Sequence, residues 1–68
     1  MNIYAKPGTK VVFIGCSNDQ LRWGSHTGRP ELLNVGGAYT VKRTEVHSSY
    51  TKVFLEETEG SFPSVSFD

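Results

Sequence analysis

The sequence predicts an all-β domain, a small β-barrel of four to five antiparallel strands with a long first loop that contains one or two short helical turns. Three observations support this fold class. Short segments rich in β-branched and aromatic residues alternate with glycine and proline turns. The 68 residues, with 37% hydrophobic and 21% charged side chains, suit a single folded domain spanning 1–68. The longest apolar run, Val11 to Ile14, is far too short to cross a bilayer.

The first half of the chain begins with a turn and a strand. The Pro-Gly turn at 6–9 leads directly into a strand at 10–14. A second strand is expected from Ala38 to Val46. Val41 and Val46 lie at positions of opposite parity, which predicts a bulge or strong bend within this strand.

The second half completes the sheet. A turn at 47–49 leads into a third strand at 50–57, which makes an antiparallel hairpin with the second. After a turn at 58–60, the last segment contains an aromatic-proline corner and a short closing strand. In that strand we expect Val65 and Phe67 to share a face.

Residues 15–37 form a connection too long to be featureless in so small a domain. Ser17 and Gln20 fit a weak capping box, with Leu21, Trp23 and a stopping Gly24 after them, which predicts one helical turn. Pro30 is suited to the first position of a second short turn. The pair Gly36-Gly37 lacks the residues of a phosphate loop, so we interpret it as a turn that permits positive φ.

Five short motifs run along the chain: Lys6-Pro7-Gly8-Thr9-Lys10-Val11, Trp23-Gly24, Leu33-x-Val35-Gly36-x-x-Tyr39-x-Val41, Glu45-Val46-His47-Ser48-Ser49-Tyr50-Thr51-Lys52-Val53 and Phe62-Pro63-x-x-x-Phe67. Together they resemble the motifs of a family of very small phage and prophage proteins with Src-homology-3-like barrels. The resemblance implies a Src-homology-3-like barrel, encoded by a phage or prophage, and supplies no catalytic residues. An oligonucleotide-binding barrel is the alternative architecture, but it needs a further strand that the sequence does not clearly offer.

Candidate catalytic and metal-binding residues do not form a recognisable set. Cys16, Asp19, His26 and His47 lack paired metal-ligand spacing, so we predict no metal and no cofactor. A lone cysteine after a strand is typical of a small buried hydrophobic residue rather than a nucleophile. It also cannot form an internal disulfide, which favours a reducing compartment. Together with the resemblance to phage proteins, this implies the cytoplasm of a bacterial host cell. The sequence therefore predicts a protein that is not an enzyme.

The remaining candidate site is a surface for a protein partner. Trp23 lies among polar residues in the long loop, an arrangement that anchors partners, although it can equally plug one end of the barrel. We predict a non-catalytic protein-binding module that uses this loop and the aromatic-proline corner. The predicted partner-binding residues are Arg22, Trp23, His26, Arg29, Tyr39, Tyr50, Phe62 and Pro63.

Two further functions remain as alternatives. A nucleic-acid-binding barrel would use Arg22, Arg29, Lys42, Arg43 and Lys52. Against it, seven basic side chains are balanced by seven acidic ones, although residues 1–43 carry six basic and two acidic side chains and residues 44–68 carry one basic and five acidic. We expect these charges to mix in the fold, and a bipolar surface is the other interpretation. A phage inhibitor of a host enzyme or defence system is the third function. No membrane partner is expected, and a homodimer fits a small core.

Overall fold

The computed structural model describes residues 1–17, 19, 22 and 26–68. Within this part of the chain, four strands and two short 3-10 helices follow one another in the sequence. They are β1 (Lys10–Val12), η1 (Pro30–Leu32), β2 (Ala38–Val46), β3 (Thr51–Leu55), β4 (Ser61–Pro63) and η2 (Ser64–Ser66). The predicted all-β class is confirmed.

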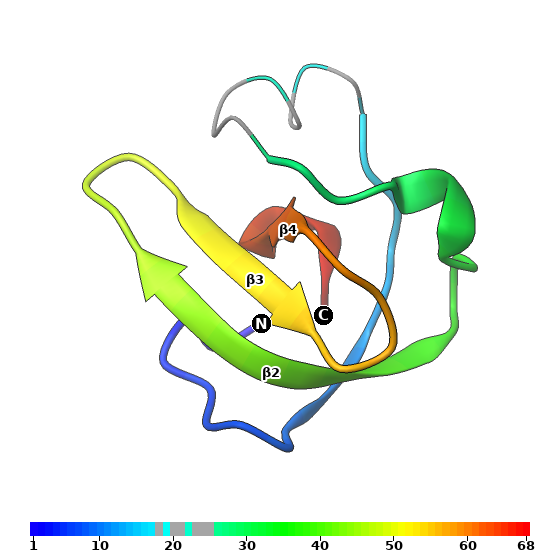
Figure 1. The fold of residues 1–68 in the computed structure, drawn as a ribbon, viewed down its shortest axis with the longest axis horizontal. Helices are drawn as coiled ribbons and strands as arrows, with labels where there is room; N and C mark the ends of the chain where they lie inside the picture. Colours follow the sequence, from blue (N-terminus) through cyan, green and yellow to red (C-terminus); the bar gives the residue numbers. More distant parts are fainter. Residues whose placement is uncertain (18, 20–21, 23–25) are drawn as a thin grey trace.

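The strands form one antiparallel sheet with the order β1-β2-β3-β4, so that each strand pairs with its neighbour in sequence. The strand β2 is long enough to pair with both β1 and β3 (Figure 1). Val41 pairs with Leu55 whereas Arg43 pairs with Phe54, so Lys42 is an extra residue in β2. This irregularity lies between Val41 and Val46 and confirms the predicted bulge, which bends the strand and increases its twist.

The C-terminal segment returns to the edge of β1. Phe13 and Phe67 form an antiparallel bridge. Val12 and Asp68 exchange backbone hydrogen bonds of 3.1 and 2.8 Å, and the N–H of Ile14 donates to the carbonyl of Ser66 at 2.8 Å. Because these bonds occupy backbone groups that an edge strand would leave unpaired, this edge is protected from pairing with another chain.

The core lies inside the curved sheet. It consists of eight buried apolar side chains: Val11, Phe13, Leu33, Val41, Val53, Leu55, Phe62 and Phe67. In β3, Thr51, Val53 and Leu55 are buried whereas the two residues between them are half-buried, as the alternation predicts. The prediction that Val65 and Phe67 share a face is wrong. Val65 lies in η2 and is 62% exposed whereas Phe67 is 2% exposed, because a 3-10 turn does not alternate its side chains as a strand does.

Residues 26–29 of the long connection after β1 run close to β4 (Figure 1), where the Gly28 N–H donates to the Ser61 carbonyl. The turn predicted at Pro30 is confirmed as η1, with the proline at its start. Gly36 has a φ of 86°, as expected for this turn. The helical turn predicted to follow Ser17 falls largely on positions 18, 20–21 and 23–25, which lie outside the described residues.

Candidate functional site

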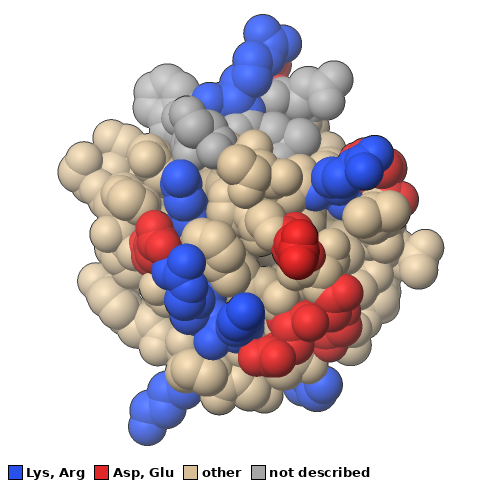
Figure 2. All heavy atoms as spheres, viewed as in Figure 1, with Lys and Arg blue, Asp and Glu red and all other residues tan. Residues whose placement is uncertain are grey.

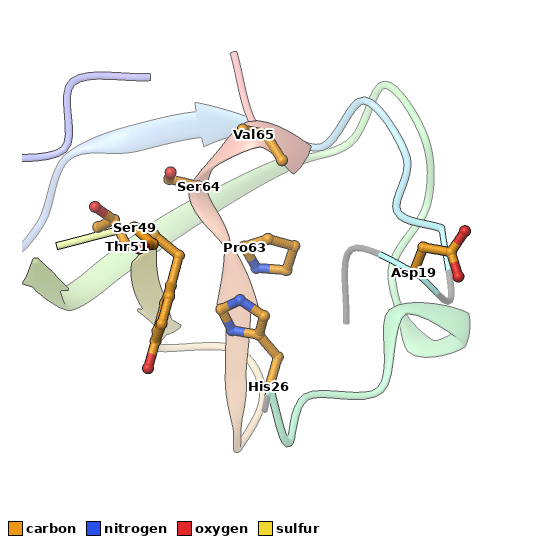
Figure 3. Close-up of a pocket in the computed structure, with 8 residues that line it drawn as sticks. Asp19, His26, Ser49, Thr51, Pro63, Ser64 and Val65 are labelled. Atoms are coloured by element: carbon orange, nitrogen blue, oxygen red, sulfur yellow. The ribbon is translucent and has the colours of Figure 1, made fainter. Parts of the chain in front are cut away.

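A mostly apolar hollow of about 390 Å³ lies beside β4 and η2. Three parts of the chain form it: the first loop, the turn between β2 and β3, and the junction of β4 with η2 (Figure 3). Its lining residues are Asp19, His26, Ser49, Tyr50, Thr51, Pro63, Ser64 and Val65. Three of the predicted partner-binding residues, His26, Tyr50 and Pro63, therefore come together here.

Tyr50 is placed by the turn that precedes β3. The N–H of His47 donates to the carbonyl of Tyr50 at 2.8 Å and closes the turn. The imidazole of His47 stacks on the Tyr50 ring with 4.7 Å between centroids, and His26 approaches it edge-on at 6.0 Å. Contacts of this kind hold an aromatic ring in a defined orientation. Tyr50 therefore presents a fixed, half-buried surface to the hollow.

Pro63 and η2 form the opposite side of the hollow. Pro63 ends β4 opposite Lys52, and the chain then turns through η2, closed by a bond from the Phe67 N–H to the Ser64 carbonyl at 3.2 Å. This turn leaves Val65 exposed beside Pro63. Val65 is not among the predicted partner-binding residues, because its sequence pattern predicts a strand. A serine-flanked valine directly after a strand-ending proline is the signal that could have indicated a turn.

His26 is held against β4 by a set of hydrogen bonds. Its Nδ1 lies 3.3 Å from the Ser61 hydroxyl, which also accepts a bond from the Thr27 N–H at 3.2 Å. The Ser61 N–H donates to the Thr27 hydroxyl at 3.1 Å, and the Gly28 N–H donates to the Ser61 carbonyl at 2.7 Å. Partial burial, together with the positive charge of Lys52, lowers the pKa of His26 below its ordinary value of 6.5.

The other predicted partner-binding residues lie elsewhere. Phe62 is fully buried and packs edge-on against Phe67. It therefore belongs to the core, and its side chain is not at the surface where a partner contact was predicted. The hydroxyl of Tyr39 accepts a bond from the Asn34 N–H at 2.7 Å, and its ring packs on the core. Arg29 is exposed and pairs with Glu31 at 3.0 Å.

Two predicted residues belong to the segment between Ser17 and His26. Arg22 is exposed and lies 3.8 Å from the carboxylate of Asp19, one of the residues that line the hollow. Trp23 lies outside the described residues. The two interpretations of Trp23, as a partner anchor or as a plug of the barrel, both stay predictions.

The basic residues of the nucleic-acid alternative lie close to carboxylates. Arg43 pairs with Glu45 and also covers the Phe54 ring, with 3.8 Å from its guanidinium carbon to the ring centroid. Lys52 lies opposite Glu45 in the register of β2 and β3. Lys42 borders a second hollow that is lined also by Glu56, Glu57 and Glu59. On the face drawn in Figure 2, acidic and basic side chains lie among one another, as expected if the charges of the two halves mix.

The described residues contain no group of three or more His, Cys, Asp or Glu side chains arranged to hold a metal ion. Cys16 is half-buried and packs against the core. No helix in the described ranges has the length and apolar character needed to span a membrane.

Comparison of the chain with protein-family models, with curated proteins and with solved structures finds no match.

Proposed function

We propose that this chain is a small non-catalytic binding module with a Src-homology-3-like barrel, encoded by a phage or prophage, and that its hollow binds an extended segment of another protein. The order of elements supports the finer fold class: a first strand, a long loop, three further strands, a 3-10 helix and a final bridge back to β1. The observation that carries the function is the hollow, where His26, Tyr50 and Pro63 meet.

The chemistry of the lining indicates the kind of ligand. Tyr50, Pro63 and Val65 offer apolar surface, which favours an apolar side chain of the partner. Ser49 and Ser64 supply hydroxyl groups at the same hollow, and these suit the N–H and C=O groups of an extended backbone. An extended peptide with an apolar side chain satisfies both parts of the surface.

Selection from a random-peptide library, followed by calorimetric titration, tests the proposal. We expect Tyr50→Ala and Val65→Asp to weaken binding of the selected peptides at least about tenfold, the loss expected when an anchor contact is removed. Tyr4→Ala and Val35→Asp are the matched controls, because Tyr4 and Val35 are 72% and 73% exposed and do not line the hollow. Selected peptides that bind both hollow variants with unchanged affinity would show that the site is wrong.

A capture experiment from nuclease-treated bacterial lysate separates this proposal from nucleic-acid binding. A protein retained in stoichiometric amount by the wild type, and lost by Val65→Asp but not by Val35→Asp, supports the proposal. Bound material that disappears on nuclease treatment, with an affinity that falls steeply as salt rises, instead supports the nucleic-acid alternative.

A further inference from the structure

Segment 26–28 of the first loop is attached to β4 through one residue, Ser61. Four hydrogen bonds join the segment to Ser61, two through its hydroxyl and two through its backbone. The Ser61 side chain is 2% exposed, so water does not replace a lost partner without a structural change. The position of this wall of the hollow therefore depends on the bonds that Ser61 makes.

The hydrogen bonds of the Ser61 hydroxyl favour a neutral His26. A hydroxyl has a single proton to donate, and of its two partners the Thr27 N–H is a donor. The only described group that can accept the Ser61 proton is therefore Nδ1 of His26, at 3.3 Å. A bond donated by Ser61 to Nδ1 fits an imidazole that is neutral and carries its proton on Nε2. A protonated imidazole would place two donors on the Ser61 oxygen and leave the buried hydroxyl proton without an acceptor.

We propose that His26 is a pH-sensitive latch, whose neutral imidazole holds segment 26–28 against β4 and whose protonation releases that segment and, with it, one wall of the hollow. The groups around the ring favour the neutral form. Lys52 of β3 repels a positive imidazole, and β4, which consists of Ser61, Phe62 and Pro63, carries no charged side chain. Tyr50 approaches from the turn before β3.

One carboxylate faces the same hollow from the first loop. Asp19 would favour a positive imidazole, but its side chain is 95% exposed and lies on the far side of Pro63 from Ser49 and Thr51 (Figure 3). Water therefore screens this carboxylate. Burial of the ring and the positive charge of Lys52 both lower the pKa of His26. This direction favours the neutral imidazole that the latch needs.

The sign of the effect follows from linkage. In the docked state, segment 26–28 is held against β4, and in the released state it is detached. The docked state lowers the pKa of His26, so the released state binds the proton more tightly. Docking is fully favoured above the ordinary pKa of 6.5 and weakens as the pH falls below it. The docking equilibrium changes about tenfold for each unit by which docking lowers the pKa.

Nuclear magnetic resonance on the free protein tests the latch without any ligand. Long-range ¹H–¹⁵N spectra at pH 7.5 are expected to show an unprotonated Nδ1 in His26. Between pH 7.5 and 5.0, we expect the hydrogen-exchange protection factors of the Thr27 and Gly28 amides to fall, about tenfold per unit of pKa difference. A proton on Nδ1 at pH 7.5, or protection that is independent of pH, overturns the latch.

Two variants assign the titration to one histidine. His26→Asn places an amide oxygen close to the position of Nδ1 and does not titrate, so its Thr27 and Gly28 protection is expected to be flat with pH. His47→Asn is the matched control, because His47 also stacks on Tyr50 whereas the hydroxyl of Ser61 bonds to His26 and Thr27. The wild-type pH dependence must persist in His47→Asn. Loss of the pH dependence in His47→Asn, or its persistence in His26→Asn, overturns the assignment.

The link to binding rests on the proposed function and is tested separately. For a peptide selected on the wild type, affinity is expected to fall with pH in parallel with the amide protection and to stay constant in His26→Asn. Amides that titrate while affinity does not change overturn the role of the latch in the hollow. Failure to select any peptide counts against the proposed function, whereas the amide titration still decides the latch.

Discussion

Two buried serines, Ser61 and Ser66, are expected to respond in opposite directions to the same substitution. The hydroxyl of Ser61 holds the two side-chain bonds to segment 26–28. The hydroxyl of Ser66, in a residue that is 0% exposed, has no hydrogen-bond partner among the described residues. Their backbone bonds, including the bond from Ile14 to the Ser66 carbonyl, do not depend on the side chain. Substitution by alanine therefore isolates the two hydroxyl groups.

The magnitudes follow from the cost of an unpaired buried hydroxyl. Ser66→Ala removes a polar group that is desolvated without compensation, so we expect the free energy of unfolding to rise by about 1 kcal/mol. Ser61→Ala leaves the Thr27 N–H unpaired and removes the partner of His26, so we expect a loss of about 1–2 kcal/mol. For a domain of this size, each kcal/mol shifts Tm by about 4–8 °C.

Urea denaturation, followed by circular dichroism at pH 7.5, measures both changes. The expected result is a higher midpoint for Ser66→Ala and a lower one for Ser61→Ala, with slopes equal to that of the wild type. The slopes are the control, because an altered slope would show a change in the surface exposed on unfolding. A Ser66→Ala variant that is less stable than the wild type would refute the reasoning about its hydroxyl.

The remaining predictions concern packing and acid. Gly28→Ala would place a Cβ atom 2.5 Å from the Phe62 ring and 2.6 Å from the Ser61 carbonyl oxygen. We therefore expect the free energy of unfolding, measured by urea denaturation, to fall by about 1–3 kcal/mol. Adding Phe62→Leu shortens the side chain but leaves the Ser61 carbonyl in place, so we expect the double variant to remain less stable than the wild type. A double variant with wild-type stability would contradict a conflict with the carbonyl. The Glu57 carboxylate accepts the Thr40 N–H at 2.9 and 3.0 Å, which lowers its pKa below the ordinary 4.5. The stabilising effect of the Glu57 carboxylate is therefore present above pH 4.5 and lost as the pH falls through the lowered pKa. The pH dependence of the carboxyl ¹³C shift measures this pKa. A value at or above 4.5 contradicts the bond to Thr40.

The strands were predictable because their signals are local. Side-chain alternation over 51–55 defines the buried face of β3, and the parity of Val41 and Val46 indicates the bulge at Lys42. The error at Val65 is also local in origin. The sequence Ser64-Val65-Ser66-Phe67 alternates as a strand does, but the chain makes a 3-10 turn directly after Pro63 instead.

The candidate site was only partly predictable because its contacts are distant in sequence. Loop aromatic residues and the proline corner indicate a surface near His26, Tyr50 and Pro63. The bond between His26 and Ser61 spans 35 positions and has no sequence signature. Composition also does not distinguish a buried aromatic residue from an exposed one, and Phe62 was therefore assigned to the surface although it belongs to the core.

The position of the hollow follows from where β4 ends. The β3–β4 ladder has its last pair at Lys52 and Pro63, after which the chain turns away into η2. On β3, Thr51 pairs with Val46 of β2 and has no partner in β4. The sheet therefore opens beside Tyr50 and Thr51, and the Pro63 ring and Val65 line the space where β4 would have continued.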